Sequence, residues 1–230
     1  MAGSPAPSPI LTGLAGTVAG FLLKVGHDYL KRARSRPSVV VRRFSNRRQG
    51  RFDRRKLPTI TSDRANARFV VLTARNTSPW TEAKECVPHV YILPTGTADA
   101  IRADGIWYPM SHTRDPTGIA ENSRSIGPRG VEPFVCLALA NGHVYYYDAM
   151  ESGDEAEDLW KRVEIGASGS FGLLTYIHSD NARKLVGRDF NVIVEDGGVP
   201  GVDVKFTLLK RRGIDFRQMM DVHEYLSTRA

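Results

Sequence analysis

The sequence contains few cysteines and no arrangement of them that would hold a metal ion. Only two occur among 230 residues, Cys86 and Cys136, without a C-x-x-C pair or a Cys/His cluster. This excludes the zinc-stabilised and disulfide-dense classes of small domain. A single disulfide between the two would require an oxidising compartment.

The short motifs of common enzyme classes are also missing. There is no P-loop, G-x-G-x-x-G, H-E-x-x-H or EF-hand pattern, and residues 166–170 (GASGS) have serine where a nucleophile elbow needs its last glycine. The acidic cluster at 151–158 lacks the spacing of a calcium loop. We identify no catalytic residue, no cofactor-binding residue, no cofactor and no metal ligand. We therefore favour a binding protein, with an active site assembled from distant residues as the alternative.

Acidic residues are scarce near the N-terminus. Residues 1–64 contain 14 Lys/Arg and 3 Asp/Glu, whereas residues 65–230 contain 18 and 22. Such asymmetry indicates a basic segment that meets phosphates, either of anionic lipid headgroups or of nucleic acid. Residues 42–56 (RRFSNRRQGRFDRRK) hold eight of these cations. The candidate phosphate or lipid-headgroup contacts are Arg42, Arg43, Arg47, Arg48, Arg51, Arg54, Arg55 and Lys56.

No charged side chain occurs from Ala2 to Leu23, and a helix is predicted over residues 9–34. Its uncharged run of 14 residues from Ile10 is shorter than the ~20 that a bilayer needs, but extension to Leu30 would give the length. We expect a single membrane span. An interfacial helix and a helix packed on the protein's own core are the alternatives. Candidate helix–helix contacts, which would support a homo-oligomer, are Gly13, Gly16 and Gly20.

Basic residues lie at and directly after the C-terminal end of this helix, at positions 31, 32, 34 and 36. By the positive-inside rule, the domain after the helix should lie in the cytoplasm. We therefore expect a single-pass membrane protein with a cytoplasmic C-terminal domain, in which Cys86 and Cys136 stay reduced and Cys86 is a small buried side chain.

The rest of the chain is rich in short strand-like runs separated by turn residues. Asn141-Gly142 is a strong hairpin signal between two of these runs, and Asn76 should cap a turn after another. Helices are few, at about 154–160 and 215–226, so a parallel α/β sheet is disfavoured and an all-β sandwich is favoured. The predicted strands are residues 38–44, 69–73, 86–93, 134–140, 143–148, 171–178, 190–195 and 202–209.

Several of these segments resemble a known family. The resemblance rests on five stretches of sequence: Leu-x-Ala-x-Asn ending at Asn76, Ala83-x-x-Cys86, Trp107 in Gly-Ile-Trp-Tyr, and residues 125–130 and 171–182. They resemble membrane-tethered immunoglobulin-like β-sandwich proteins of unknown function from bacteria and archaea. The resemblance covers about residues 10–210, departs from the family at 148–163, and supplies no catalytic residues. It implies an immunoglobulin-like antiparallel sandwich with an N-terminal transmembrane helix and short additional helices.

These observations predict three segments: a membrane anchor at 1–36, a basic arm with the first strand at 37–64, and a sandwich domain at 65–230. The leading functional hypothesis is a membrane-tethered cytoplasmic sandwich that binds an unknown protein partner. The alternative is a nucleic-acid-binding, coat-like sandwich that uses the arginine-rich arm.

Overall fold

The computed structural model describes residues 20–28, 36–44, 68–94, 99–108, 122–140, 143–148, 160–163, 169–195 and 205–228. The chain divides into two compact units, Met1–Arg36 and Pro37–Ala230. In the first unit, residues 20–28 are helical. None of the helices in the described ranges is both long and apolar enough to cross a bilayer. Residues 9–19 and 29–34 of the predicted transmembrane helix lie outside the described ranges.

In the second unit, most of the residues that the structure describes lie in strands. They are β1 (Val39–Arg43), β2 (Arg68–Asn76), β3 (Ala83–Pro94), β4 (Ile101–Asp104), β5 (Ile106–Trp107), β6 (Arg124–Ile126), β7 (Val131–Ala140), β8 (His143–Tyr147), β9 (Trp160–Val163), β10 (Ser170–His178), β11 (Leu185–Glu195) and β12 (Lys205–Phe216). One helix, α3 (Met219–Ser227), follows β12.

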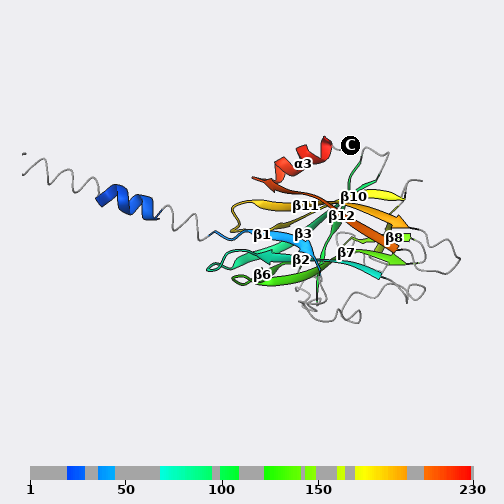
Figure 1. Ribbon diagram of the computed structural model, residues 1–230, viewed down its shortest axis with the longest axis horizontal. Coiled ribbons are helices and arrows are strands. Elements are labelled where there is room, and N and C mark those ends of the chain that lie inside the picture. The colour runs from blue at the N-terminus through cyan, green and yellow to red at the C-terminus, as the bar shows by residue number, and fades with distance from the viewer. Residues whose placement is uncertain are drawn as a thin grey trace, which may run out of the picture. The chain divides into compact units, whose positions relative to one another are not determined.

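Eight of these strands form a closed barrel (Figure 1). The order around it is β7-β2-β1-β11-β10-β3-β4-β8, and the pairing of β8 with β7 completes the ring. Neighbours are antiparallel except β1 and β11, which run parallel and pair at Val40 and Val186. The other four strands attach to this ring: β5 to β7, β6 to β3, β9 to β8 and β12 to β11.

The predicted immunoglobulin-like sandwich is therefore wrong. A sandwich keeps two separate sheets with open edges, whereas here the hydrogen-bonded ladder returns to its starting strand. Two strands complete the ring through their pairings. β1 pairs with both β2 and β11, and β8 pairs with both β7 and β4. Strands in both architectures alternate inward apolar and outward residues, so the sequence pattern alone did not distinguish them.

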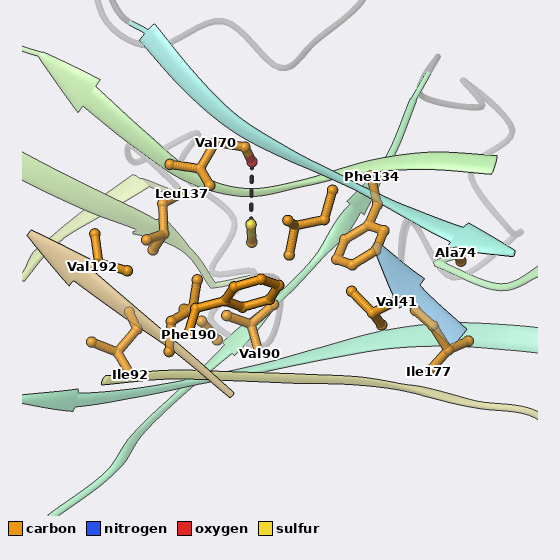
Figure 2. Packing of buried hydrophobic residues seen from close by; sticks show 14 of the residues in the cluster. Val41, Val70, Ala74, Val90, Ile92, Phe134, Leu137, Ile177, Phe190 and Val192 are labelled. Atoms are coloured by element: carbon orange, nitrogen blue, oxygen red, sulfur yellow. Dashed lines mark hydrogen bonds between the residues drawn. The ribbon is translucent and has the colours of Figure 1, made fainter. Parts of the chain in front are cut away.

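The barrel interior is filled by side chains (Figure 2). Val41, Val70, Val90 and Phe190 reach it from four different strands and are at most 1% exposed. The thiol of Cys136 lies there too and donates to the carbonyl of Val70 at 3.2 Å. An eight-stranded barrel is just wide enough to be filled in this way, so the interior is a packed core.

Two further apolar clusters cover the outer surface of the barrel. One gathers around Tyr147 and Trp160. The other lies beneath α3, where Val222 and Leu226 pack on Tyr176 and Phe216. These clusters stabilise the barrel from outside by removing aromatic surface from water.

Several local predictions are confirmed and others need correction. The hairpin of β7 and β8 is formed, with Ala140 opposite His143. Trp160, which was predicted to end a helix, opens β9, and residues 154–159 lie outside the described ranges. The terminal helix exists but starts at Met219, because β12 continues to Phe216.

Candidate functional site: the tryptophan turn

The segment between β2 and β3, residues 76–82, is here called the tryptophan turn. Its Trp80 is 81% exposed, while Trp107 and Trp160 are each 3% exposed. An exposed tryptophan gains nothing from burial in the isolated chain. The turn therefore presents a large apolar side chain to the surroundings, and its backbone explains how.

Asn76, the last residue of β2, organises the turn from a fully buried position. Its amide nitrogen donates to the carbonyls of Thr81 (2.8 Å), Ile126 (3.0 Å) and Gly127 (3.2 Å). Its side-chain oxygen accepts from the backbone N–H of Ser78 at 3.0 Å. The prediction that Asn76 caps a turn is confirmed, and the one side chain joins three chain segments.

Ser78 continues this network inside the turn. Its hydroxyl oxygen accepts from the N–H groups of Trp80 (3.3 Å) and Thr81 (3.1 Å). Its carbonyl accepts from the N–H of Arg129 at 2.9 Å. Thr77 donates through both its N–H and its hydroxyl to the carbonyl of Ser38, which precedes β1. Serine and asparagine side chains are suited to such local turn bonds.

The far end of the turn is held by the β10–β11 connection. Asn181 donates to the carbonyl of Glu82 at 2.9 Å and accepts from the N–H of Lys84 at 3.0 Å. The hydroxyl of Ser179 donates to the carbonyl of Lys84 at 2.8 Å. The turn is thus hydrogen-bonded to elements on both sides, which restrains the backbone that carries Trp80.

Basic side chains lie on the segments bonded to the turn. Arg129 and Arg183 are exposed, and neither has an ion-pair partner among the residues that the structure describes. Arg75 of β2 pairs with Val131, which is itself 37% exposed. Glu82 and Glu85 are exposed where the chain continues into β3.

Both cysteines are free and buried. Burial raises the pKa of the Cys86 thiol to about 11, although a bond to Ser179 opposes the shift. Burial raises the pKa of the Cys136 thiol as well. At neutral pH both are protonated, and a protonated buried thiol is a poor nucleophile. Cys86 is the small buried side chain that the sequence predicted.

A second polar group lies on the outer face of the barrel near α3. His89 is 8% exposed and stacks on Tyr176, with ring centroids 5.0 Å apart. Burial, with smaller contributions from Arg102 and His178, lowers the pKa of His89 to about 4. Tyr225 of α3 donates to Asp189 at 2.9 Å. The group is enclosed by its own neighbours, so it stabilises the packing of α3 rather than offering an open site.

Of the predicted phosphate contacts, the structure describes two. Arg42 and Arg43 are exposed at the end of β1. Arg47, Arg48, Arg51, Arg54, Arg55 and Lys56 lie outside the described residues. So do Gly13 and Gly16, while Gly20 begins the described helical stretch with open space around its Cα. Because β1 and β2 are antiparallel neighbours, the basic segment between them joins two adjacent strands and is an internal connection.

No group of three or more His, Cys, Asp or Glu side chains within the described ranges is arranged to hold a metal ion. His178 and Asp180 lie 3.6 Å apart, and both side chains are exposed to solvent. Sequence reasoning missed Trp80. The available signal was a tryptophan inside a turn-forming run, where the alternation of a strand is absent.

No protein-family model, curated protein or solved structure matches this chain. The resemblance to membrane-tethered immunoglobulin-like proteins therefore stays a prediction, and function must be argued from the geometry.

Proposed function

We propose that the protein is a non-catalytic binding module that recognises a protein partner through the tryptophan turn. The observation that carries the proposal is the exposure of Trp80, at 81%, on a turn whose backbone is hydrogen-bonded to three other segments. Tryptophan is among the residues most enriched at the energetic centres of protein interfaces.

The restrained backbone supports this function because the conformational entropy that a loop loses on binding opposes association. A loop that is already ordered loses less on association than a mobile one. Asn76 and Ser78 hold the turn in the free protein, so a partner would meet Trp80 in a preformed position. Burial of one such side chain contributes on the order of 2–4 kcal/mol to a typical interface.

The packing of the barrel also favours its outer surface as the place of function. The interior is occupied by core side chains such as Phe134, Phe171 and Leu72, all at most 1% exposed. A ligand would have to displace these side chains to enter, at a cost of several kcal/mol in lost packing.

A photo-cross-linking amino acid at position 82, an exposed position of the turn that leaves Trp80 in place, tests the proposal, with the same group at position 220 as the matched control. Met220 is 70% exposed on α3. In an extract of the source cells, position 82 should give a discrete cross-linked protein and position 220 should not. Unlabelled wild-type protein should compete for this product, and Trp80→Ala should not. Equal cross-linking from both positions, or equal competition by Trp80→Ala, would refute a role for the turn.

A second candidate function is binding of nucleic-acid phosphates. It is favoured by the exposed Arg42 and Arg43, which lead into the basic connection between β1 and β2. Phosphate neutralisation releases counterions, so the logarithm of affinity should fall linearly with the logarithm of salt concentration. Arg42→Glu with Arg43→Glu should reduce that slope and weaken binding to single-stranded RNA or DNA. Arg162→Glu on β9 is the control. A slope near zero in the wild type would exclude this candidate.

A further inference from the structure

The surroundings of Trp80 indicate what chemistry a partner should have, on the premise that the tryptophan turn binds protein. Arg129 lies in the turn that precedes β7, and its N–H donates to the carbonyl of Ser78, two residues before Trp80. Arg183 lies on another side, where its N–H donates to the carbonyl of Pro37 at 3.5 Å. Pro37 is followed by Ser38, the acceptor of Thr77. Arg129 is therefore bonded directly to the turn, and Arg183 is bonded to the segment 37–38, which Thr77 of the turn also bonds.

The backbone of Arg129 is held in an uncommon conformation. Its φ is +57°, in the left-handed region where a residue with a Cβ carries a cost of about 1 kcal/mol. The conformation is fixed by the bond from its N–H to Ser78 and by the bond from Gly130 to the carbonyl of Gly127 at 2.9 Å. Glycine or asparagine would fit this backbone with less strain. An exposed arginine here directs a cation outward from a fixed position next to the turn.

The carboxylates of this end are Glu132, Asp180, Glu82 and Glu85, and the turn itself contains only Glu82, at its β3 end. Glu132 accepts from Arg124 at 3.0 Å, and Asp180 lies 3.6 Å from His178. Glu82 and Glu85 are exposed on the chain that leads into β3, with Lys84 between them. The end of β2 and the turn at 127–130 carry Arg75, which is opposite Val131 on β7, and the exposed Arg129, whereas the exposed Arg183 lies in the β10–β11 connection.

We propose that the tryptophan turn, Arg129 and Arg183 together bind an acidic peptide segment that carries an exposed aromatic or aliphatic side chain. The indole would cover the apolar side chain of the partner. Arginine suits the flanking role because its planar guanidinium pairs with a carboxylate through two parallel hydrogen bonds. Charge complementarity at the rim adds specificity and speeds association, whereas the buried apolar contact supplies most of the affinity.

Selection from a displayed library of random 12-residue peptides tests this inference on the full-length protein. Peptides retained by the wild type should combine an aromatic or aliphatic residue with an excess of Asp and Glu over the unselected library. For the best synthetic peptide, Trp80→Ala should weaken binding at least 10-fold. Arg129→Glu with Arg183→Glu should weaken it about 10-fold or more, and Arg162→Glu should leave it unchanged.

A change at Arg129 could disturb the local turn, so Arg129→Gly provides a second variant. Glycine fits the left-handed backbone and removes the whole arginine side chain with its cation, and this variant should still bind the acidic peptide more weakly. The outcomes separate the two proposals. Selected peptides that depend on Trp80 but show no acidic excess, or that bind the charge-reversed variant equally well, would overturn the acidic partner and leave protein binding intact. Selected peptides that bind Trp80→Ala as tightly as the wild type would overturn both.

Discussion

Trp107 and Trp80 place the same side chain in two opposite settings. Trp107, in β5, packs edge-on against Phe134, and its indole N–H donates to the carbonyls of Cys86 and Asn122, each at 3.1 Å. Its ring is 3% exposed, against 81% for Trp80. In the first region the backbone positions the indole for packing. In the second, a hydrogen-bonded backbone holds the indole away from the barrel.

The difference shows that order and burial are separate properties. The tryptophan turn is restrained by polar bonds from Asn76 and Ser78, not by packing of its large side chain. These hydrogen bonds thus stabilise a conformation in which the apolar surface of Trp80 stays in water. Such an arrangement is expected of a binding element on a rigid scaffold.

The largest expected effect is the loss of Trp107. Trp107→Ala removes a buried ring and two hydrogen bonds from its indole N–H, and should lower the free energy of unfolding by about 3–5 kcal/mol. Urea denaturation followed by circular dichroism measures it. A loss below about 1 kcal/mol would mean that Trp107 does not stabilise the core in the way described.

His89, like Trp107, has a buried ring. Unlike the indole N–H of Trp107, its Nδ1 has no hydrogen-bond partner among the described residues. Its pKa is about 4 in the folded protein, against 6.5 as the ordinary value. Between these values the unfolded chain binds more protons, so stability falls as pH falls from about 6.5 and the loss is complete below about 4. The expected loss is about 3 kcal/mol. Urea unfolding at pH 7 and pH 4 should show a smaller difference for His89→Phe than for the wild type.

Comparing wild type with His89→Phe separates the contribution of His89 from that of other groups that titrate at low pH. Carboxylates also protonate at low pH, so the informative quantity is the difference between the two proteins and not the total loss. Equal pH dependence in wild type and His89→Phe would contradict a neutral, buried His89.

Asn76→Ala tests what orders the tryptophan turn. The change leaves the N–H of Ser78 and the carbonyls of Ile126 and Thr81 without their side-chain partner, and should cost about 2–3 kcal/mol in unfolding free energy. Asn181→Ala, at the more exposed end, is the matched control and should cost about 1 kcal/mol. An equal cost for both would show that burial of Asn76 adds nothing to the network.

Trp80→Ala should have the smallest effect on stability. An exposed side chain outside the core changes the unfolding free energy by no more than about 0.5 kcal/mol. The same urea measurement as for Trp107→Ala provides the comparison. A loss above about 2 kcal/mol would show that Trp80 packs on the protein itself, and the proposed binding role would fail with it.

The sequence predicts the local structure of this protein better than it predicts the closure of the sheet into a barrel. Asn141-Gly142 identified a hairpin, and Asn76 identified a turn, because each rests on local chemistry. The pairing of β1 with β11, through Val40 and Val186, joins residues far apart in the chain and leaves no local pattern. Apolar alternation fills a sandwich and a barrel equally well, so the sequence could not show that the sheet closes.

The candidate site shows the same limit at the level of single residues. Ser78 and Asn76 are turn formers by type, but their partners Arg129 and Gly127 come from a segment about 50 positions away. Trp107 and Trp80 both lie near the ends of strands, and only the fold buries one and exposes the other. Arg42 and Arg43 were chosen as candidate phosphate contacts from the local density of charge alone. That choice requires no knowledge of tertiary contacts.

Amide hydrogen exchange in the full-length protein tests the central claim, that Trp80 is presented by a preformed turn, most directly. Residue-resolved NMR would follow the N–H groups of Ser78, Trp80 and Thr81, which donate to Asn76 and Ser78. The account predicts that the buried N–H of Ser78 exchanges about 100-fold or more below its intrinsic rate, and that Asn76→Ala removes this protection. Exchange of all three groups at intrinsic rates in the wild type would contradict it, because the tryptophan would then sit on a mobile loop.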